Sequence, residues 1–190
     1  MRLFIAIDLD EPARAAIADE QRRLKAAIGP TRAMVKWVRP EQMHLTLVFL
    51  GEVPEARAPA IVDVINEPVA QPAFDLALGS IGVFPSRGAP NVLWIGAAAG
   101  EAASVQLQQQ LADRVASLGI ALERRPFHPH LTLARLRDSR PRDRASFLGA
   151  AGERVVATSR VDHATLYQSK LSSQGSDYTA LARATLSGSG

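Results

Sequence analysis

The chain has 190 residues, enough for one compact domain or for two lobes that share a core. Its 47% hydrophobic and 22% charged residues are typical of a soluble globular protein, and the net charge of +3 suits an anionic ligand without requiring one. The absence of cysteine excludes disulfides, zinc–thiolate sites and cysteine nucleophiles. No run approaches the roughly 20 apolar residues of a membrane span, and the apolar stretch before Asp8 is too short for a secretory signal. We therefore expect a cytoplasmic protein.

In the first half of the chain, strand-like and helix-like segments alternate without a long linker. Residues 2–8 predict a strand, and Asp10, Glu11 and Pro12 then form a typical helix start, with acidic groups at the positive end of the helix dipole. This helix should end at residues 29–30, Gly-Pro. Strands are expected over residues 34–38 and 44–50, and a helix over residues 55–66.

The second half continues the alternation. Strands are expected over residues 74–81 and 92–96, then a helix over residues 101–118 that places Val105, Leu111, Val115 and Leu118 on one face and is capped by Gly119. A segment over residues 126–136, a short helix over 142–151 and strands near 155–161, 165–169 and 178–185 complete the domain, which should span residues 1–186. The final SGSG, residues 187–190, predicts a flexible tail.

One four-residue motif occurs twice in the chain. His44-Leu45-Thr46-Leu47 recurs as His130-Leu131-Thr132-Leu133, 86 positions later and thus close to half a chain away. A duplicated half-domain would explain this spacing, with the halves related by an approximate two-fold axis.

Each copy has a specific local geometry if it forms a strand. Side chains alternate between the two faces of a strand, so each histidine projects together with the threonine two residues later, while the leucines turn into the core. If the two halves face each other, two imidazoles and two hydroxyls line one cleft. One imidazole can act as a base and the other as an acid, each typically contributing about 10²–10⁴-fold in rate. The hydroxyls can hold phosphate oxygens, so the set matches phosphodiester cleavage and requires no metal.

The histidines also allow interpretations other than catalysis. A single His-x-Thr on a strand is more often structural than catalytic, but two copies in matching contexts favour function. His128 and His130 together could indicate a metal site, although no third ligand and no cysteine lie nearby in the sequence. His163 is interpreted as a surface or turn histidine.

With these motifs and their flanks, the sequence resembles the two-histidine (2H) phosphoesterases, and among them the bacterial and archaeal RNA 2′,3′-cyclic phosphodiesterases, historically called 2′-5′ RNA ligases. The resemblance covers nearly the whole chain. It rests on RLFIAI at residues 2–7, WV at 37–38, HLTLVFLGEV at 44–53, FP at 84–85, NVLW at 91–94, PFHPHLTLAR at 126–135, LYQS at 166–169, and on Gly175 with Tyr178.

The resemblance implies roles that the residues alone leave open. His44 would be the proton donor to the leaving 3′ oxygen, and His130 the proton acceptor that activates water, giving an end with a 2′-phosphate. Thr46 and Thr132 would hold the phosphate. In the reverse direction the histidines would exchange roles, which the family associates with joining 2′-5′ ends.

Further residues are candidates for substrate binding. Arg135 resembles an arginine that the family places near the phosphate, but strict alternation puts it on the face of Leu131; either a bulge or the strand's end redirects it, or it is a solvated arginine. Phe84, Phe127 and Tyr167 could stack on a base, or each could belong to the core.

The predicted fold is α+β, with two pseudo-symmetric lobes, each an antiparallel sheet with outer helices, and the active cleft between them. The predicted function is hydrolysis of RNA 2′,3′-cyclic phosphate ends by a monomer that binds neither metal nor cofactor. The alternatives are a 2H enzyme for small cyclic nucleotides or 2′-5′ oligonucleotides, and a non-catalytic RNA-binding module.

Overall fold

The computed structural model describes residues 1–190 except 30, 124, 153, 173–174 and 189–190, and it leaves the side chains of residues 171, 172 and 175 undescribed as well. The strands of the described residues are β1 (Arg2–Asp8), β2 (Met34–Trp37), β3 (His44–Glu52), β4 (Phe74–Phe84), β5 (Val92–Ala99), β6 (His130–Arg137), β7 (Ala157–Val161), β8 (His163–Ser172) and β9 (Gly175–Thr185). The helices are α1 (Glu11–Ala27), α2 (Ala58–Asn66), α3 (Glu101–Ser117) and α4 (Asp143–Gly149), with 3₁₀ turns η1 (Pro40–Gln42) and η2 (Glu55–Arg57).

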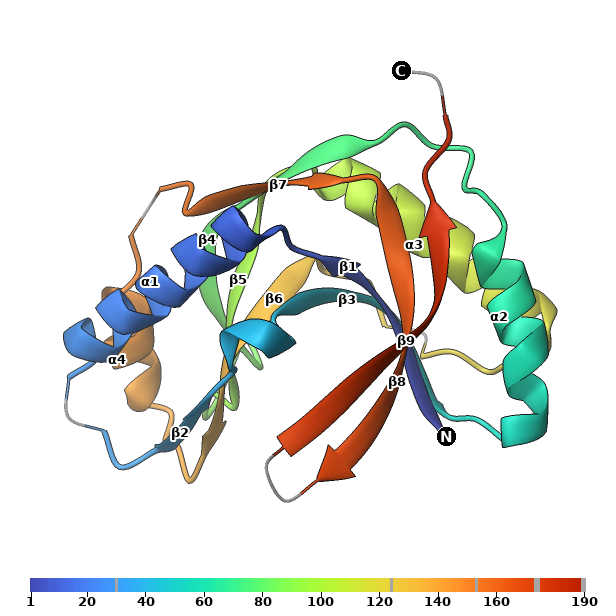
Figure 1. Ribbon diagram of the computed structural model, residues 1–190. Coiled ribbons are helices and arrows are strands. Elements are labelled where there is room, and N and C mark those ends of the chain that lie inside the picture. The colour runs from blue at the N-terminus through green and yellow to red at the C-terminus, as the bar shows by residue number, and fades with distance from the viewer. Residues whose placement is uncertain (30, 124, 153, 173–174, 189–190) are drawn as a thin grey trace.

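All of these strands belong to one antiparallel sheet, in the order β7-β4-β5-β6-β3-β1-β8-β9, with β2 added alongside β6. The order is symmetric about the central pair of β6 and β3: β5 corresponds to β1, β4 to β8 and β7 to β9. Figure 1 shows the sheet curled, with helices α1 and α4 outside one half and α2 and α3 outside the other. The predicted α+β fold with two pseudo-symmetric antiparallel halves and outer helices is confirmed, and the halves join in one continuous sheet.

Local chemistry explains the start of α1 and the end of α3. The Asp10 side chain accepts a hydrogen bond from the Ala13 N–H, 2.9 Å away, and so caps α1, whose second residue is Pro12. Gly119 has the positive φ of 72° expected of a residue that ends a helix, here α3.

Within the segment over residues 126–136, β6 begins at His130, since Pro129 lacks the N–H that a ladder needs. One expectation about the second half is wrong. The side chain of Val105 is exposed on α3, since the buried face consists of Ser104, Leu107, Leu111 and Val115. Val105 lies six residues from Leu111, which turns it about 240° around the helix axis and away from the core.

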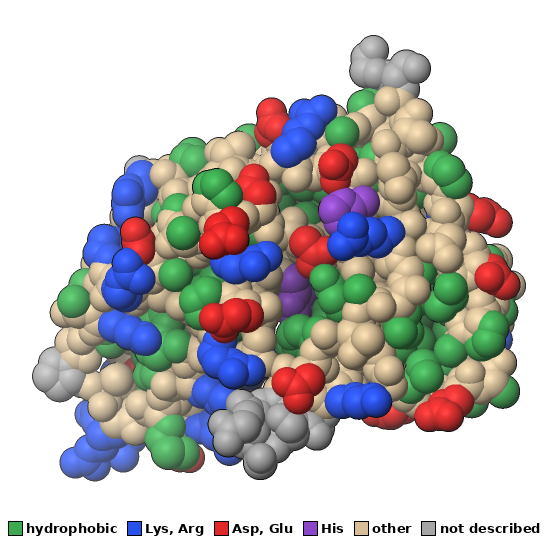
Figure 2. Space-filling view, in the orientation of Figure 1, with side chains coloured by type: hydrophobic (Ala, Val, Ile, Leu, Met, Phe, Trp, Pro, Cys, Tyr) green, Lys and Arg blue, Asp and Glu red, His purple; other side chains and the backbone are tan. Residues whose placement is uncertain are grey.

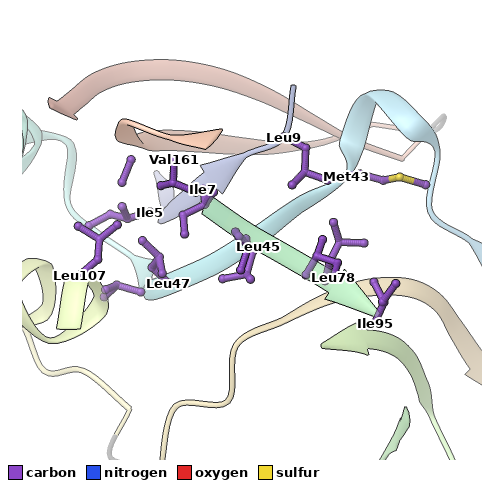
Figure 3. Packing of buried hydrophobic residues seen from close by; sticks show 14 of the residues in the cluster. Ile5, Ile7, Leu9, Met43, Leu45, Leu47, Leu78, Ile95, Leu107 and Val161 are labelled. Atoms are coloured by element: carbon purple, nitrogen blue, oxygen red, sulfur yellow. The ribbon is translucent and has the colours of Figure 1, made fainter. Parts of the chain in front are cut away.

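The core lies between the sheet and its helices. The leucines of the two echoed motifs, Leu45, Leu47, Leu131 and Leu133, are all buried, as the strand alternation predicts. Figure 3 shows Leu45 and Leu47 among the side chains of neighbouring strands, with Leu47 the nearer of the two to Leu107 of α3. Each histidine strand is therefore anchored from behind by fully desolvated leucines, which typically contribute about 1.5–3 kcal/mol each.

At the carboxyl end, Ser187 and Gly188 donate backbone hydrogen bonds to the carbonyls of Val69 and Gln71, and residues 189–190 of the predicted tail lie outside the described residues. Within the described part of the chain, no helix is long and apolar enough to cross a membrane.

Candidate active site

The two echoed motifs meet at the centre of the sheet. Leu45 of β3 pairs with Leu131 of β6 in antiparallel register. Extending that register by one residue in each direction places His44 across from Thr132, and His130 across from Thr46. The two histidines are then diagonal neighbours on one face, with Cα atoms about 7–8 Å apart. Thus the imidazole–hydroxyl pairs inferred from strand alternation share one surface.

Both imidazoles are held by the same kind of hydrogen bond. The Nδ1 atom of His44 lies 2.8 Å from the carbonyl oxygen of Gln42, and Nδ1 of His130 lies 2.6 Å from that of His128. Because a carbonyl oxygen only accepts, Nδ1 must carry a proton and donate it in each case. Nε2 is therefore the atom of each ring that can take up or release a proton.

Identical β-bulges follow the two motifs. On β3 the pairing with β1 shifts between Val48 and Thr46, so Leu47 is the extra residue; on β6 the pairing with β5 shifts between Ala134 and Thr132, so Leu133 is the extra residue. The extra residue reverses the alternation beyond it. Arg135, which simple parity assigns to the leucine face, is exposed and shares the face of His130 and Thr132. Its counterpart on β3 is Phe49, which is likewise exposed.

The electrostatic surroundings of the two histidines differ. Burial lowers the pKa of His44; the hydrogen bond to the Gln42 carbonyl and the Asp8 carboxylate counteract this, and the Arg135 charge adds to it. Burial also lowers the pKa of His130, whose bond to the His128 carbonyl counteracts this while the charges of His128 and Arg135 add to it. Of these two histidines, His44 alone has an acidic neighbour among the described residues.

This asymmetry comes from the flanking strands. Asp8 of β1 pairs directly with His44, whereas the corresponding residue of β5, paired with His130, is Gly96. Asp8 also accepts hydrogen bonds from the hydroxyls of Thr165 and Tyr167, both at 2.7 Å. These two bonds fix the position of the carboxylate beside His44.

Aromatic rings form the wall beside His44. The Phe4 ring stacks on the imidazole of His44 at 4.8 Å between centroids, and Tyr178 meets the same imidazole edge-on at 5.2 Å. Tyr167 stacks on the other side of Phe4 at 5.4 Å. Burial and the Asp8 carboxylate raise the pKa of the Tyr167 hydroxyl well above its usual value, so it remains a hydrogen-bond donor.

A second aromatic wall flanks His130. Phe84 contacts His130 edge-on at 5.0 Å between centroids and stacks on Trp94 at 5.1 Å, and Trp94 contacts His128 at 4.9 Å. The indole lies flat against the backbone of Gly82, where a Cβ atom would come within 2.1 Å of a ring carbon. Glycine at this position is therefore what allows Trp94 to lie beside Thr132, its partner across the β5–β6 ladder.

The remaining candidates divide clearly. Phe84 and Tyr167 lie in the walls just described, while Phe127 packs, half-buried, against the core.

His163 is half-buried, with Nδ1 2.5 Å from a carboxylate oxygen of Asp162 and Nε2 3.8 Å from one of Asp8, rather than being a plain surface histidine. Across the described residues, His128 and His130 are joined by no third side chain that would complete a metal-binding group.

Several residues of the site were missed by the sequence reasoning, namely Phe4, Asp8, Trp94 and Tyr178 as wall and charge residues. For Phe4 and Asp8 the sequence contained a signal. They lie four positions apart on β1, so their side chains are on the same face of the strand. Nothing local in the sequence indicated which strand would lie beside His44.

The site is accessible from outside. His44, Thr46, His130 and Thr132 are half-buried rather than fully buried, and Figure 2 shows a histidine side chain at a hollow near the middle of the molecule, with basic side chains below it. The arrangement can donate a proton on one side of a phosphate, accept one on the other, and offer two hydroxyls and a guanidinium to its oxygens.

Comparison with known proteins agrees with this chemistry. The family model described as the 2′-5′ RNA ligase superfamily matches residues 9–172. The RNA 2′,3′-cyclic phosphodiesterase of Methanothermobacter thermautotrophicus is 34% identical over 181 residues, covering 94% of this chain and 95% of the relative. The relative of the same name from Thermus thermophilus is also 34% identical, over 99% of this chain and 91% of its own length.

Solved structures extend the likeness to three dimensions. A Thermus thermophilus protein superimposes with a TM-score of 0.79 at 31% identity and covers 99% of both chains. Escherichia coli LigT, solved in complex with 3′-AMP, gives a TM-score of 0.73 at 31% identity over 97% of both chains. By its matched residues, its fold and its paired histidine strands, this chain belongs to the 2′-5′ RNA ligase superfamily.

Proposed function

We propose that the protein hydrolyses the 2′,3′-cyclic phosphate at the 3′ end of RNA to a 2′-phosphomonoester. The observation that carries the proposal is the pair of imidazoles, each fixed through Nδ1 so that Nε2 remains free, on one face with Thr46 and Thr132. The relatives named RNA 2′,3′-cyclic phosphodiesterase support the choice of substrate.

In the proposed reaction, His130 accepts a proton from water as the water oxygen attacks phosphorus. The bond from phosphorus to O3′ breaks, and His44 donates the proton that O3′ needs to leave as a hydroxyl. The phosphate stays attached through O2′. The Asp8 carboxylate beside His44 favours the protonated acid, and the neutral Gly96 beside His130 leaves the base without such a partner.

The phosphate oxygens carry negative charge that increases during attack. Thr46 and Thr132 donate hydrogen bonds to the non-bridging oxygens, and Arg135, directed to this face by its bulge, compensates their charge. A terminal 5′-hydroxyl in place of water would give a 2′-5′ phosphodiester by the same bond changes.

The decisive experiment uses an RNA with a 2′,3′-cyclic phosphate end, in the presence of EDTA. His44→Ala and His130→Ala should each lower kcat by about 10²–10⁴-fold while the thermal melting temperature stays close to that of the wild type. Thr158→Val serves as a control for Thr46→Val and Thr132→Val, because Thr158 is exposed on β7, at the far edge of the sheet.

The outcomes separate the possibilities. Unchanged turnover in either histidine variant would contradict the two-histidine mechanism. Tight binding of the RNA without cleavage by the wild type would instead indicate a binding module. We further propose that the protein acts as a monomer in the cytoplasm. Size-exclusion chromatography with light scattering tests the oligomeric state.

A further inference from the structure

A row of basic side chains leads away from the reaction centre. Lys36 of β2 pairs with Arg135 of β6, and Met34 pairs with Arg137, so these four side chains lie in two cross-strand pairs. All four are exposed. The alternate β2 residues, Val35 and Trp37, are half-buried and pack against the core.

The row begins at the catalytic face. Arg135 comes after the bulge at Leu133 and shares the face of His130 and Thr132. Arg137 follows two residues further along β6, about 7 Å away. This spacing is comparable to the distance between successive phosphates of a nucleic-acid strand.

The charges of the row are uncompensated within the described part of the chain. No described carboxylate forms an ion pair with Lys36, Arg135 or Arg137, whereas Arg23, Arg154 and Arg160 each have one. In Figure 2, basic side chains gather over the region of β2 and β6, below the central hollow.

Among the described residues, the position that corresponds to Arg135 in the other half of the sheet is not basic. Phe49, the counterpart of Arg135, is an exposed aromatic ring, and the Arg2 guanidinium lies over it at 5.0 Å from the ring centroid. The two ends of the site are therefore chemically different, although the strands that build them are related by symmetry. A polyanionic strand therefore meets unpaired cations at one end of the site and an aromatic ring at the other.

We propose that Lys36 and Arg137 bind backbone phosphates of the RNA strand on the 5′ side of the cyclic phosphate, with Met34 contacting a base. The enzyme would then act on oligoribonucleotides in preference to mononucleotides. This inference rests on the proposed function, because a 2′,3′-cyclic phosphate stands at a 3′ end and leaves the chain only its 5′ side. Arg135 lies next to the reacting phosphate, and the two further cations extend its charge along the strand.

The test compares two substrates, a nucleoside 2′,3′-cyclic phosphate and a short single-stranded RNA with the same terminal nucleotide. We expect the wild type to have a higher kcat/KM for the RNA than for the mononucleotide. The kcat/KM for the RNA should fall as the salt concentration rises. Each cation removed should reduce the slope of log(kcat/KM) against log[salt] by about 0.7. Lys36→Ala, Arg137→Ala and the charge reversal Lys36→Glu should lower the ratio of the RNA to the mononucleotide kcat/KM by about threefold or more each at low salt. Arg160→Ala, at an exposed site on β7, is the matched control and should leave the ratio unchanged.

The results distinguish the inference from the function on which it rests. A wild type that cleaves neither substrate would refute the proposed function. A wild type that cleaves both with equal, salt-independent kcat/KM, or variants with an unchanged ratio, would refute the inference alone. Melting temperatures close to that of the wild type ensure that any change reflects binding, as expected for exposed side chains.

Discussion

The contrast between Asp8 and Gly96 predicts what happens when the Asp8 charge is removed. Asp8→Asn keeps the size of the side chain but deletes the carboxylate that raises the pKa of His44. Residues paired across antiparallel strands have Cα atoms about 4.5–5.5 Å apart, so we take about 6 Å as the separation of the two side-chain charges. Asp8 is 27% exposed, so water screens the interaction. With an effective dielectric constant of about 40–80, Coulomb's law gives about 0.7–1.4 kcal/mol, a factor of about 3–10.

The sign of the effect on rate follows from the roles. On the alkaline side of the pH profile, the rate is limited by the fraction of the acid that is still protonated. If His44 is the acid, a lower pKa for His44 reduces kcat/KM there by about 3–10-fold, less whatever the stronger acid regains in proton transfer. On the acidic side, where deprotonation of His130 is limiting, the rate should be unchanged.

The assay is the pH dependence of kcat/KM with the cyclic-phosphate RNA. A gain on the acidic side with no loss on the alkaline side would mean that His44 is the base, and would refute the assigned roles. An equal loss at every pH would mean that Asp8 acts by positioning rather than by charge. Tyr167→Phe is the control, because it removes one hydrogen bond to Asp8 while keeping the carboxylate.

Three further outcomes are expected. Leu45→Ala removes a fully buried side chain behind His44 and should lower the free energy of unfolding by about 2–5 kcal/mol, measured by urea denaturation; a loss below 1 kcal/mol would contradict the packing described. Gly82→Ala should displace the indole of Trp94, changing the near-ultraviolet circular dichroism and lowering kcat/KM, and an unchanged spectrum would count against the close approach. Glu20→Gln removes a buried carboxylate that accepts hydrogen bonds from Arg23 and Arg154, and these bonds, that of Arg23 first, lower the pKa of Glu20. Its stabilising effect should be complete above the usual pKa of 4.5 and disappear as the pH falls through the lowered value, so the two proteins should become equally stable in acid; a stability difference that grows in acid would be the contrary result.

Much of the site could be predicted because its determinants are local. The alternation of His44, Leu45, Thr46 and Leu47 has the two-residue period of a strand, and burial of the leucines fixes which face the histidine and threonine occupy. The same holds for the second motif. The caps of α1 and α3 are similarly local, since Asp10 and Gly119 act within one turn of the helix.

Predictions weakened where a residue's surroundings come from elsewhere in the chain. The apolar character of Val105 predicts that it belongs to the buried face of α3, but that face consists of Ser104, Leu107, Leu111 and Val115. Phe127 and Phe84 are both aromatic residues beside prolines, and only the packing separates the one against the core from the one against His130.

The sequence by itself thus determined the chemistry: two imidazole–hydroxyl pairs, each backed by leucines, half a chain apart. The tertiary structure decided how these pairs combine. The register of β3 and β6 sets His44 across from Thr132, the bulge at Leu133 turns Arg135 toward the face of His130, and β1 sets Asp8 beside His44. Side-chain period is a property of a single strand, whereas register, bulges and neighbouring charges arise only when strands distant in the chain pair with one another.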